Sequence, residues 1–184
     1  MKPLLIAEVK TGSPFGFKST KSWDELFKLA NNYGDWISIH TDPLWGGSFE
    51  LLAKARGRTK KPILAKGIHA TDEDIVRAFA AGADYALVVG RMPKIPHEKL
   101  LFEPLTLAEL SRYPSDTKVV WNTRDLTTGR QKDETIVDAR KTWKGWLCQA
   151  SMIAHPHDSA LGVDAILVGE HLEQFIAYKH DNTL

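Results

Sequence analysis

Short apolar segments alternate with amphipathic segments along the whole chain. The apolar segments are rich in Val and Ile, which is typical of buried strands. They cover residues 4–9, 36–40, 63–66, 85–89, 100–103, 118–122, 145–148 and 165–168. Helical spacing of apolar positions predicts helices over residues 22–32, 48–56, 72–81, 105–112, 134–142 and 170–179, with a weak turn near 156–161.

Strands that alternate with helices predict a parallel sheet, and eight such units predict a compact (β/α)8 TIM barrel in one domain over residues 1–184. With 184 residues, each unit has about 23, so the helices must be short. The alternative is an open, doubly wound sheet. It is less favoured because the segment KTGSP at residues 10–14 is not the GxGxxG turn that follows the first strand of dinucleotide-binding sheets.

Charge and composition exclude several classes of protein. The 24 basic and 23 acidic side chains give a net charge of +1, which argues against a nucleic-acid partner or a membrane surface. The single cysteine, Cys148, excludes an intrachain disulfide and a CxxC metal site, and we expect it to pack in the core. No signal peptide or membrane-spanning segment is recognised, so we expect a soluble cytoplasmic protein.

Polar side chains end or directly follow four of the predicted strands. They are Glu8 and Lys10, Lys66, Glu103, and Asn122 with Arg124. Because the carboxyl ends of all strands meet at one mouth of a barrel, we expect these side chains to form one site. Such lysines and carboxylates suit proton transfer on a carbon skeleton. We expect burial to pull the pKa of Lys66 toward neutrality, with Glu8 and Glu103 opposing this shift.

Residues 163–172 read as a strand, a glycine and the start of a helix. The backbone N–H groups of Gly169 and Glu170 would then face the mouth, as in phosphate sites of such barrels. We expect the carboxylate of Glu170 to point away from the bound anion.

These residues resemble the indole-3-glycerol phosphate synthases of tryptophan biosynthesis, in the right order over nearly the whole chain. The resemblance rests on IAEVKTGSP at residues 6–14, ISIHTD at 37–42 with GS at 47–48, PILAK at 62–66, AAGAD at 80–84, FE at 102–103, NTRDL at 122–126, and residues 163–172. The first motif and NTRDL are the most specific.

The resemblance implies a carboxy-lyase that closes the indole ring of 1-(2-carboxyphenylamino)-1-deoxyribulose 5-phosphate, releases carbon dioxide and water, and uses no metal or organic cofactor. By position, Lys66 would be the general acid on the substrate ketone, and Glu103 and Glu8 would move protons or stabilise the intermediate. Lys10 would pair with the substrate carboxylate, and Asn122 would orient the substrate with support from Arg124. Ser13, Ser151 and the backbone of Gly169 and Glu170 would hold the phosphate.

The chain also departs from the family pattern. The family's Glu-Ser-Gly at strand seven is matched by Ala150, Ser151 and Met152, so a glutamate and a glycine are replaced. We expect Met152 to weaken phosphate binding, because a side chain restricts the approach of the backbone. The family's Lys-Asp-Phe is matched by KGI at residues 66–68, and we expect Trp45 to replace the lost aromatic wall.

Further departures concern what covers the mouth. The first strand is predicted to begin at residue 4, so we expect no counterpart of the family's N-terminal helical extension, and we expect the fourth helix to shrink to residues 93–99. A homo-oligomer or a partner chain is expected to cover the open mouth.

Two other functions stay open: a non-catalytic barrel that binds a phosphorylated metabolite, and another sugar-phosphate isomerase or lyase on the same fold. A metal site is not expected. His155 and His157 lie two residues apart near Asp158, without a clear third ligand and without the usual zinc spacing.

Overall fold

The computed structural model describes residues 2–181 and contains eight parallel strands that close into a barrel, each strand pairing with the next and β8 with β1. The strands are β1 (Leu4–Val9), β2 (Trp36–His40), β3 (Ile63–Lys66), β4 (Tyr85–Val89), β5 (Leu100–Glu103), β6 (Lys118–Asn122), β7 (Leu147–Ala150) and β8 (Ala165–Val168). This confirms the (β/α)8 barrel. Strand β7 lies two residues further along the chain than predicted.

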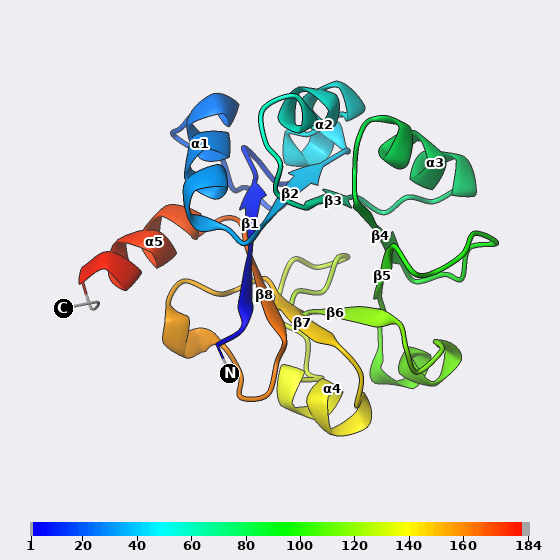
Figure 1. Cartoon of the computed structure of the whole chain (residues 1–184). Coiled ribbons are helices and arrows are strands. Elements are labelled where there is room, and N and C mark those ends of the chain that lie inside the picture. The colour runs from blue at the N-terminus through cyan, green and yellow to red at the C-terminus, as the bar shows by residue number, and fades with distance from the viewer. Residues whose placement is uncertain (1, 182–184) are drawn as a thin grey trace.

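The helices lie around the outside of the strand ring, and α5 returns beside α1 (Figure 1). They are α1 (Trp23–Tyr33), α2 (Phe49–Arg56), α3 (Asp72–Ala80), α4 (Ile136–Thr142) and α5 (Leu172–Asp181), with short 3-10 helices η1 (Pro43–Trp45), η2 (Leu107–Arg112) and η3 (Pro156–Asp158). Serine or threonine side chains cap the N-termini of α1 to α4, which explains why these short helices begin where they do.

Two predicted helices differ in the structure. Residues 93–99 form bends and turns instead of a helix, because Pro96 lacks a backbone N–H and disfavours helical geometry in the residue before it. The predicted helix over residues 105–112 is the 3-10 helix η2. Six residues followed closely by Pro114 suit this tighter, shorter form.

The barrel interior is packed, so only the strand ends have room for a site. Apolar side chains from seven strands fill the interior: Ile6, Leu64, Leu87, Leu101, Val120, Cys148, Ala150, Ala165 and Leu167. A larger apolar cluster lies between the strands and the helices. Cys148 is fully buried, as predicted, and burial raises the pKa of its thiol. Over residues 2–181, the helices are too short or too polar to cross a membrane.

Candidate active site

A cavity with about 450 Å³ of empty space, counted together with the part that is open to solvent, lies at the carboxyl ends of the strands. Five of the residues predicted at strand ends line it: Lys10, Lys66, Glu103, Asn122 and Arg124. A second, smaller cavity, with about 290 Å³ of empty space on the same measure, lies beside it at the ends of β7 and β8, and Glu8, Lys10 and Arg124 line its wall. Closure of the barrel therefore brings together all the polar strand-end residues that the sequence singled out.

Lys66 and Glu8 form a buried ion pair at the floor of the mouth. Lys66 Nζ lies 3.1 Å from Glu8 Oε1, and the two residues are 8% and 2% exposed. Burial lowers the pKa of Lys66, but the carboxylates of Glu8 and Glu103 outweigh it and raise the pKa above its usual value. The predicted shift toward neutrality was therefore wrong. Lys66 stays protonated at neutral pH.

Glu8 is the ionised partner of this pair. Burial raises the pKa of Glu8, but the positive charges of Lys66 and Lys10 and the hydrogen bond from Lys66 outweigh it and lower the pKa to about 2. The end of β8 passes very close to this carboxylate. A Cβ on Gly169 would lie 2.1 Å from Glu8 Oε2, so a side chain at this position would displace Glu8.

Glu103 and Asn122 form a hydrogen-bonded pair opposite Glu8. Asn122 Nδ2 donates to Glu103 Oε1 at 2.9 Å, and Asn122 Oδ1 accepts from the backbone N–H of Arg124 at 3.0 Å. Both ends of the amide are therefore fixed. Burial raises the pKa of Glu103 more than Lys66 and Asn122 lower it. A carboxylate whose pKa is raised is a stronger base than a carboxylate in water.

Glu170 turns its carboxylate into the mouth. Its two oxygens lie 2.9 Å from Lys10 Nζ and 2.7 Å from Arg124 Nη2. Burial raises the pKa of Glu170, but Lys10 and Arg124 outweigh it and lower the pKa. The expectation that this carboxylate points away was wrong, because two cations from the ends of β1 and β6 attract it.

The two predicted serine ligands differ in position. Ser151 lines both cavities, whereas Ser13 lines neither, and Ser13 Oγ accepts the N–H of Phe15 at 3.3 Å. Ser151 and Met152 both have left-handed backbone angles, with φ of 68° and 56°. Met152 occupies a conformation that favours glycine and lines the second cavity.

Aromatic and apolar side chains form one wall of the larger cavity. Trp45 lines it, as predicted, and stacks on His40 with ring centroids 5.0 Å apart and an interplanar angle of 1°. Phe15, Ile68 and Leu126 line the same cavity. This wall offers a flat surface for an aromatic ring beside the ionised groups.

The sequence prediction missed His40. This histidine ends β2, is 4% exposed, and places Nε2 3.9 Å from Glu8 Oε1, while its Nδ1 is buried without a hydrogen-bond partner. Burial lowers its pKa to about 3, so the ring is neutral at neutral pH. The rule that singled out polar residues at strand ends could have identified His40, since this residue ends the second apolar segment.

At the end of β7, Ala150 is fully buried and belongs to the apolar interior. It pairs with Asn122 across the sheet, at the level of the site. The mouth therefore has two buried carboxylates, Glu8 and Glu103, and an apolar side chain at the position where the family pattern has a glutamate.

We expect Glu170→Gln to raise the affinity for inorganic phosphate about tenfold, because the substitution removes the negative charge that now occupies Lys10 and Arg124. Titration calorimetry with phosphate measures this. Glu173→Gln is the matched control, since Glu173 lies nearby in the first turn of α5 and pairs with Lys21 at the surface. If both variants bind phosphate with equal affinity, the Glu170 carboxylate does not compete with phosphate for Lys10 and Arg124.

Comparison with known proteins adds to the geometry. The chain is 27% identical over 192 residues to the indole-3-glycerol phosphate synthase of Campylobacter jejuni, which covers 91% of this chain and 74% of that enzyme. It is 33% identical over 143 residues to the enzyme of the same name from Thermococcus kodakarensis, covering 74% and 60% of the two chains. The chain is a relative of the indole-3-glycerol phosphate synthases.

A further relative of the same name, from Sulfurisphaera tokodaii, is 36% identical over 90 residues, which are 48% of this chain and 37% of that enzyme. No family model matches the chain. The names of these relatives support a lyase as the general class of this protein.

Proposed function

We propose that the barrel mouth closes the indole ring of 1-(2-carboxyphenylamino)-1-deoxyribulose 5-phosphate, with loss of carbon dioxide and water, as in tryptophan biosynthesis. The observation that carries this proposal is the protonated, buried Lys66 beside the two carboxylates of Glu8 and Glu103. The lyase names of the relatives agree with it.

Ring closure needs an acid at the substrate ketone. In the proposed reaction, the ring carbon that carries the carboxylate attacks the ketone carbon, and Lys66 Nζ gives its proton to the ketone oxygen. The new carbon–carbon bond leaves a positively charged, iminium-like ring. Glu8 and Glu103, both buried near Lys66, stabilise this charge more strongly than groups in water would.

The later steps need a leaving group and a base. Loss of carbon dioxide returns its bonding electrons to the ring. The hydroxyl that was the ketone oxygen then takes a proton and leaves as water, and a carboxylate removes a proton from the neighbouring carbon to complete the indole. Glu103 suits this last role because burial raises its pKa and Asn122 fixes its orientation.

Substrate binding uses the two ends of the mouth. The aromatic ring of the substrate lies against Trp45, whose ring is held parallel to that of His40. The phosphate lies in the second cavity, near Ser151 and the N–H groups of Gly169 and Glu170, and the substrate carboxylate pairs with Lys10. Since the Glu170 carboxylate forms ion pairs with Lys10 and Arg124, an incoming anion must compete with it for these two cations.

We expect this chain to catalyse ring closure slowly, because Ala150 stands where the family pattern has a glutamate. Ala150→Glu is therefore expected to raise the rate or leave it unchanged. The added carboxylate would enter a tightly packed interior, so the thermal stability of this variant must be measured alongside its rate.

The test is an assay of the purified chain with the carboxyphenylamino-deoxyribulose phosphate, in which the indole product is detected by its fluorescence. Glu103→Gln is the paired variant, since it keeps the shape of the side chain but cannot act as a base. We expect slow product formation by the wild type and a large loss in the variant. Binding of the substrate without turnover would refute the lyase and favour a non-catalytic metabolite-binding barrel.

A further inference from the structure

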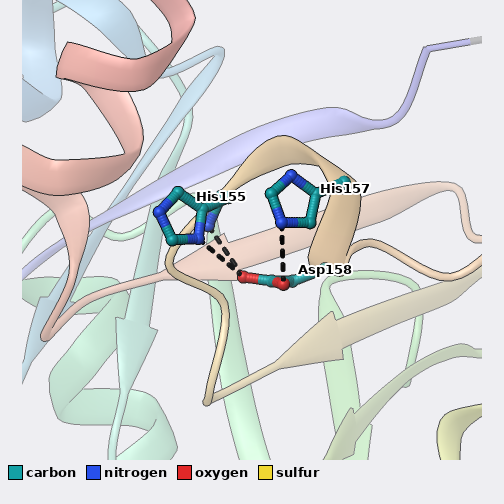
Figure 2. Close-up of side chains that lie close together, drawn as sticks. All are labelled: His155, His157 and Asp158. Atoms are coloured by element: carbon teal, nitrogen blue, oxygen red, sulfur yellow. Dashed lines mark hydrogen bonds and ion pairs between the residues drawn. The ribbon is translucent and has the colours of Figure 1, made fainter.

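Three side chains of metal-ligand type gather outside the barrel mouth, at the connection between β7 and β8. His155, His157 and Asp158 lie in and next to the short helix η3, with both imidazole rings facing one carboxylate (Figure 2). One donor atom from each residue lies within 4.8 Å of the other two. None of the three residues lines either mouth cavity.

The distances between these donor atoms are close to those of a metal site. His155 Nδ1 lies 3.6 Å from Asp158 Oδ2, and His157 Nε2 lies 3.7 Å from Asp158 Oδ1. With metal–ligand bonds of about 2.0–2.1 Å and tetrahedral geometry, neighbouring donors lie about 3.3 Å apart. The two His–Asp separations exceed this value by only a few tenths of an ångström, and rotation of the histidine side chains would have to close these gaps and the His155–His157 separation, which is at most 4.8 Å.

Contacts with α5 and with the turn itself hold the ligands in place. The rings of His155 and His157 stack at 5.0 Å with an interplanar angle of 4°, and the ring of Tyr178 packs edge-on against both, at 5.1 and 5.6 Å. Asp158 Oδ2 accepts the backbone N–H groups of Ala154 and His155 at 2.9 and 2.8 Å. Because these groups are already ordered, ion binding loses little conformational entropy.

The His155 ring also has a hydrogen-bonding neighbour on its other nitrogen. Gln174 Nε2 lies 3.0 Å from His155 Nε2. A ligating histidine normally donates its second ring N–H to an oxygen acceptor, which fixes the orientation of the ring. Rotation of the Gln174 amide by half a turn presents its oxygen to His155, and then His155 Nδ1 is free to bind an ion.

We propose that His155, His157 and Asp158 bind a divalent transition-metal ion, with Zn²⁺ as the best match and water completing its coordination. Two imidazoles and one carboxylate suit Zn²⁺, whereas Mg²⁺ and Ca²⁺ prefer oxygen ligands throughout. The residue spacing predicted no metal site because no third ligand was evident. The turn of η3 places Asp158 beside both histidines and supplies that ligand. Through Gln174, the ion would strengthen the link between the β7–β8 connection and α5.

The test is titration calorimetry of the untagged full chain with zinc chloride, together with the absorption spectrum of the Co²⁺-loaded protein. We expect one equivalent of Zn²⁺ to bind, and His157→Ala to weaken this binding at least tenfold. The His157 side chain is 64% exposed, so its removal leaves the fold intact. Zn²⁺ is expected to raise the Tm of the wild type but not that of His157→Ala.

His97→Ala is the matched control. His97 is a partly exposed histidine 3.3 Å from the carboxylate of Asp116, and it is not part of a three-donor group among residues 2–181. We expect His97→Ala to bind Zn²⁺ as the wild type does. If His157→Ala keeps wild-type affinity, or if His97→Ala weakens binding to the same extent, the proposed site is wrong.

Discussion

Lys66→Met is expected to lower the rate of indole formation about 100-fold or more, the usual scale for a general acid. The methionine side chain is similar in length but cannot give a proton to the ketone. The substitution also leaves the buried Glu8 carboxylate without its ion-pair partner at 3.1 Å. We therefore expect the free energy of unfolding to fall by about 3 kcal/mol, as when one member of a buried ion pair is removed.

Lys66→Arg separates these two effects. The guanidinium keeps the positive charge beside Glu8, but it does not give up a proton readily. We expect this variant to lose activity as Lys66→Met does, while its unfolding free energy stays closer to that of the wild type. Steady-state rates and chemical denaturation of both variants measure the two quantities. Activity within threefold of wild type in Lys66→Met would contradict the mechanism.

The wild type is expected to lose about 2 kcal/mol of unfolding free energy between pH 7 and pH 5 through His40 alone. Burial lowers the pKa of His40 from 6.5 to about 3 in the folded protein. Below pH 6.5 the unfolded chain therefore binds a proton at this position that the folded protein does not bind. The stability is present above pH 6.5 and is lost as the pH falls toward 3.

His40→Phe tests this directly, because phenylalanine keeps the stacking on Trp45 but does not titrate. In the wild type, unfolding below pH 6 takes up about one proton at His40, and in the variant it does not. We therefore expect the unfolding free energy of the variant to fall by about 1.4 kcal/mol less per pH unit than that of the wild type. Glu8 contributes its own loss only below about pH 4.5, outside this window. Denaturation curves at pH 5, 6 and 7 give the comparison, and parallel pH profiles would rule out the buried neutral histidine.

The strand pattern was sufficient to predict the barrel and much of its mouth. Apolar segments with Glu8, Lys66, Glu103 and Asn122 at or next to their ends correspond to strands of the structure, and these polar residues line the two cavities. This succeeds because the carboxyl ends of all the strands of a closed parallel barrel face the same way. The connections were less predictable, since residues 93–99 form bends and turns around Pro96 where the family pattern led us to expect a shortened helix.

The features that could not be predicted depend on which charges meet in space. The inward turn of the Glu170 carboxylate results from Lys10, 160 positions away in the chain, and from Arg124, 46 positions away. The raised pKa of Lys66 depends on two carboxylates from other strands that outweigh burial. Ser13 fits the motif of the family, yet its hydroxyl accepts a hydrogen bond within its own loop.

The most direct test of the proposed reaction is a carbon balance on substrate labelled with ¹³C at the carboxylate. The chemistry proposed for Lys66, Glu8 and Glu103 releases one labelled carbon dioxide for each indole formed, and both products appear with the same time course. We predict this one-to-one ratio for the wild type and neither product above background for Lys66→Met. Consumption of the substrate without labelled carbon dioxide, or product formation that is equal in the two proteins, would contradict the assignment of this barrel mouth as the site of ring closure.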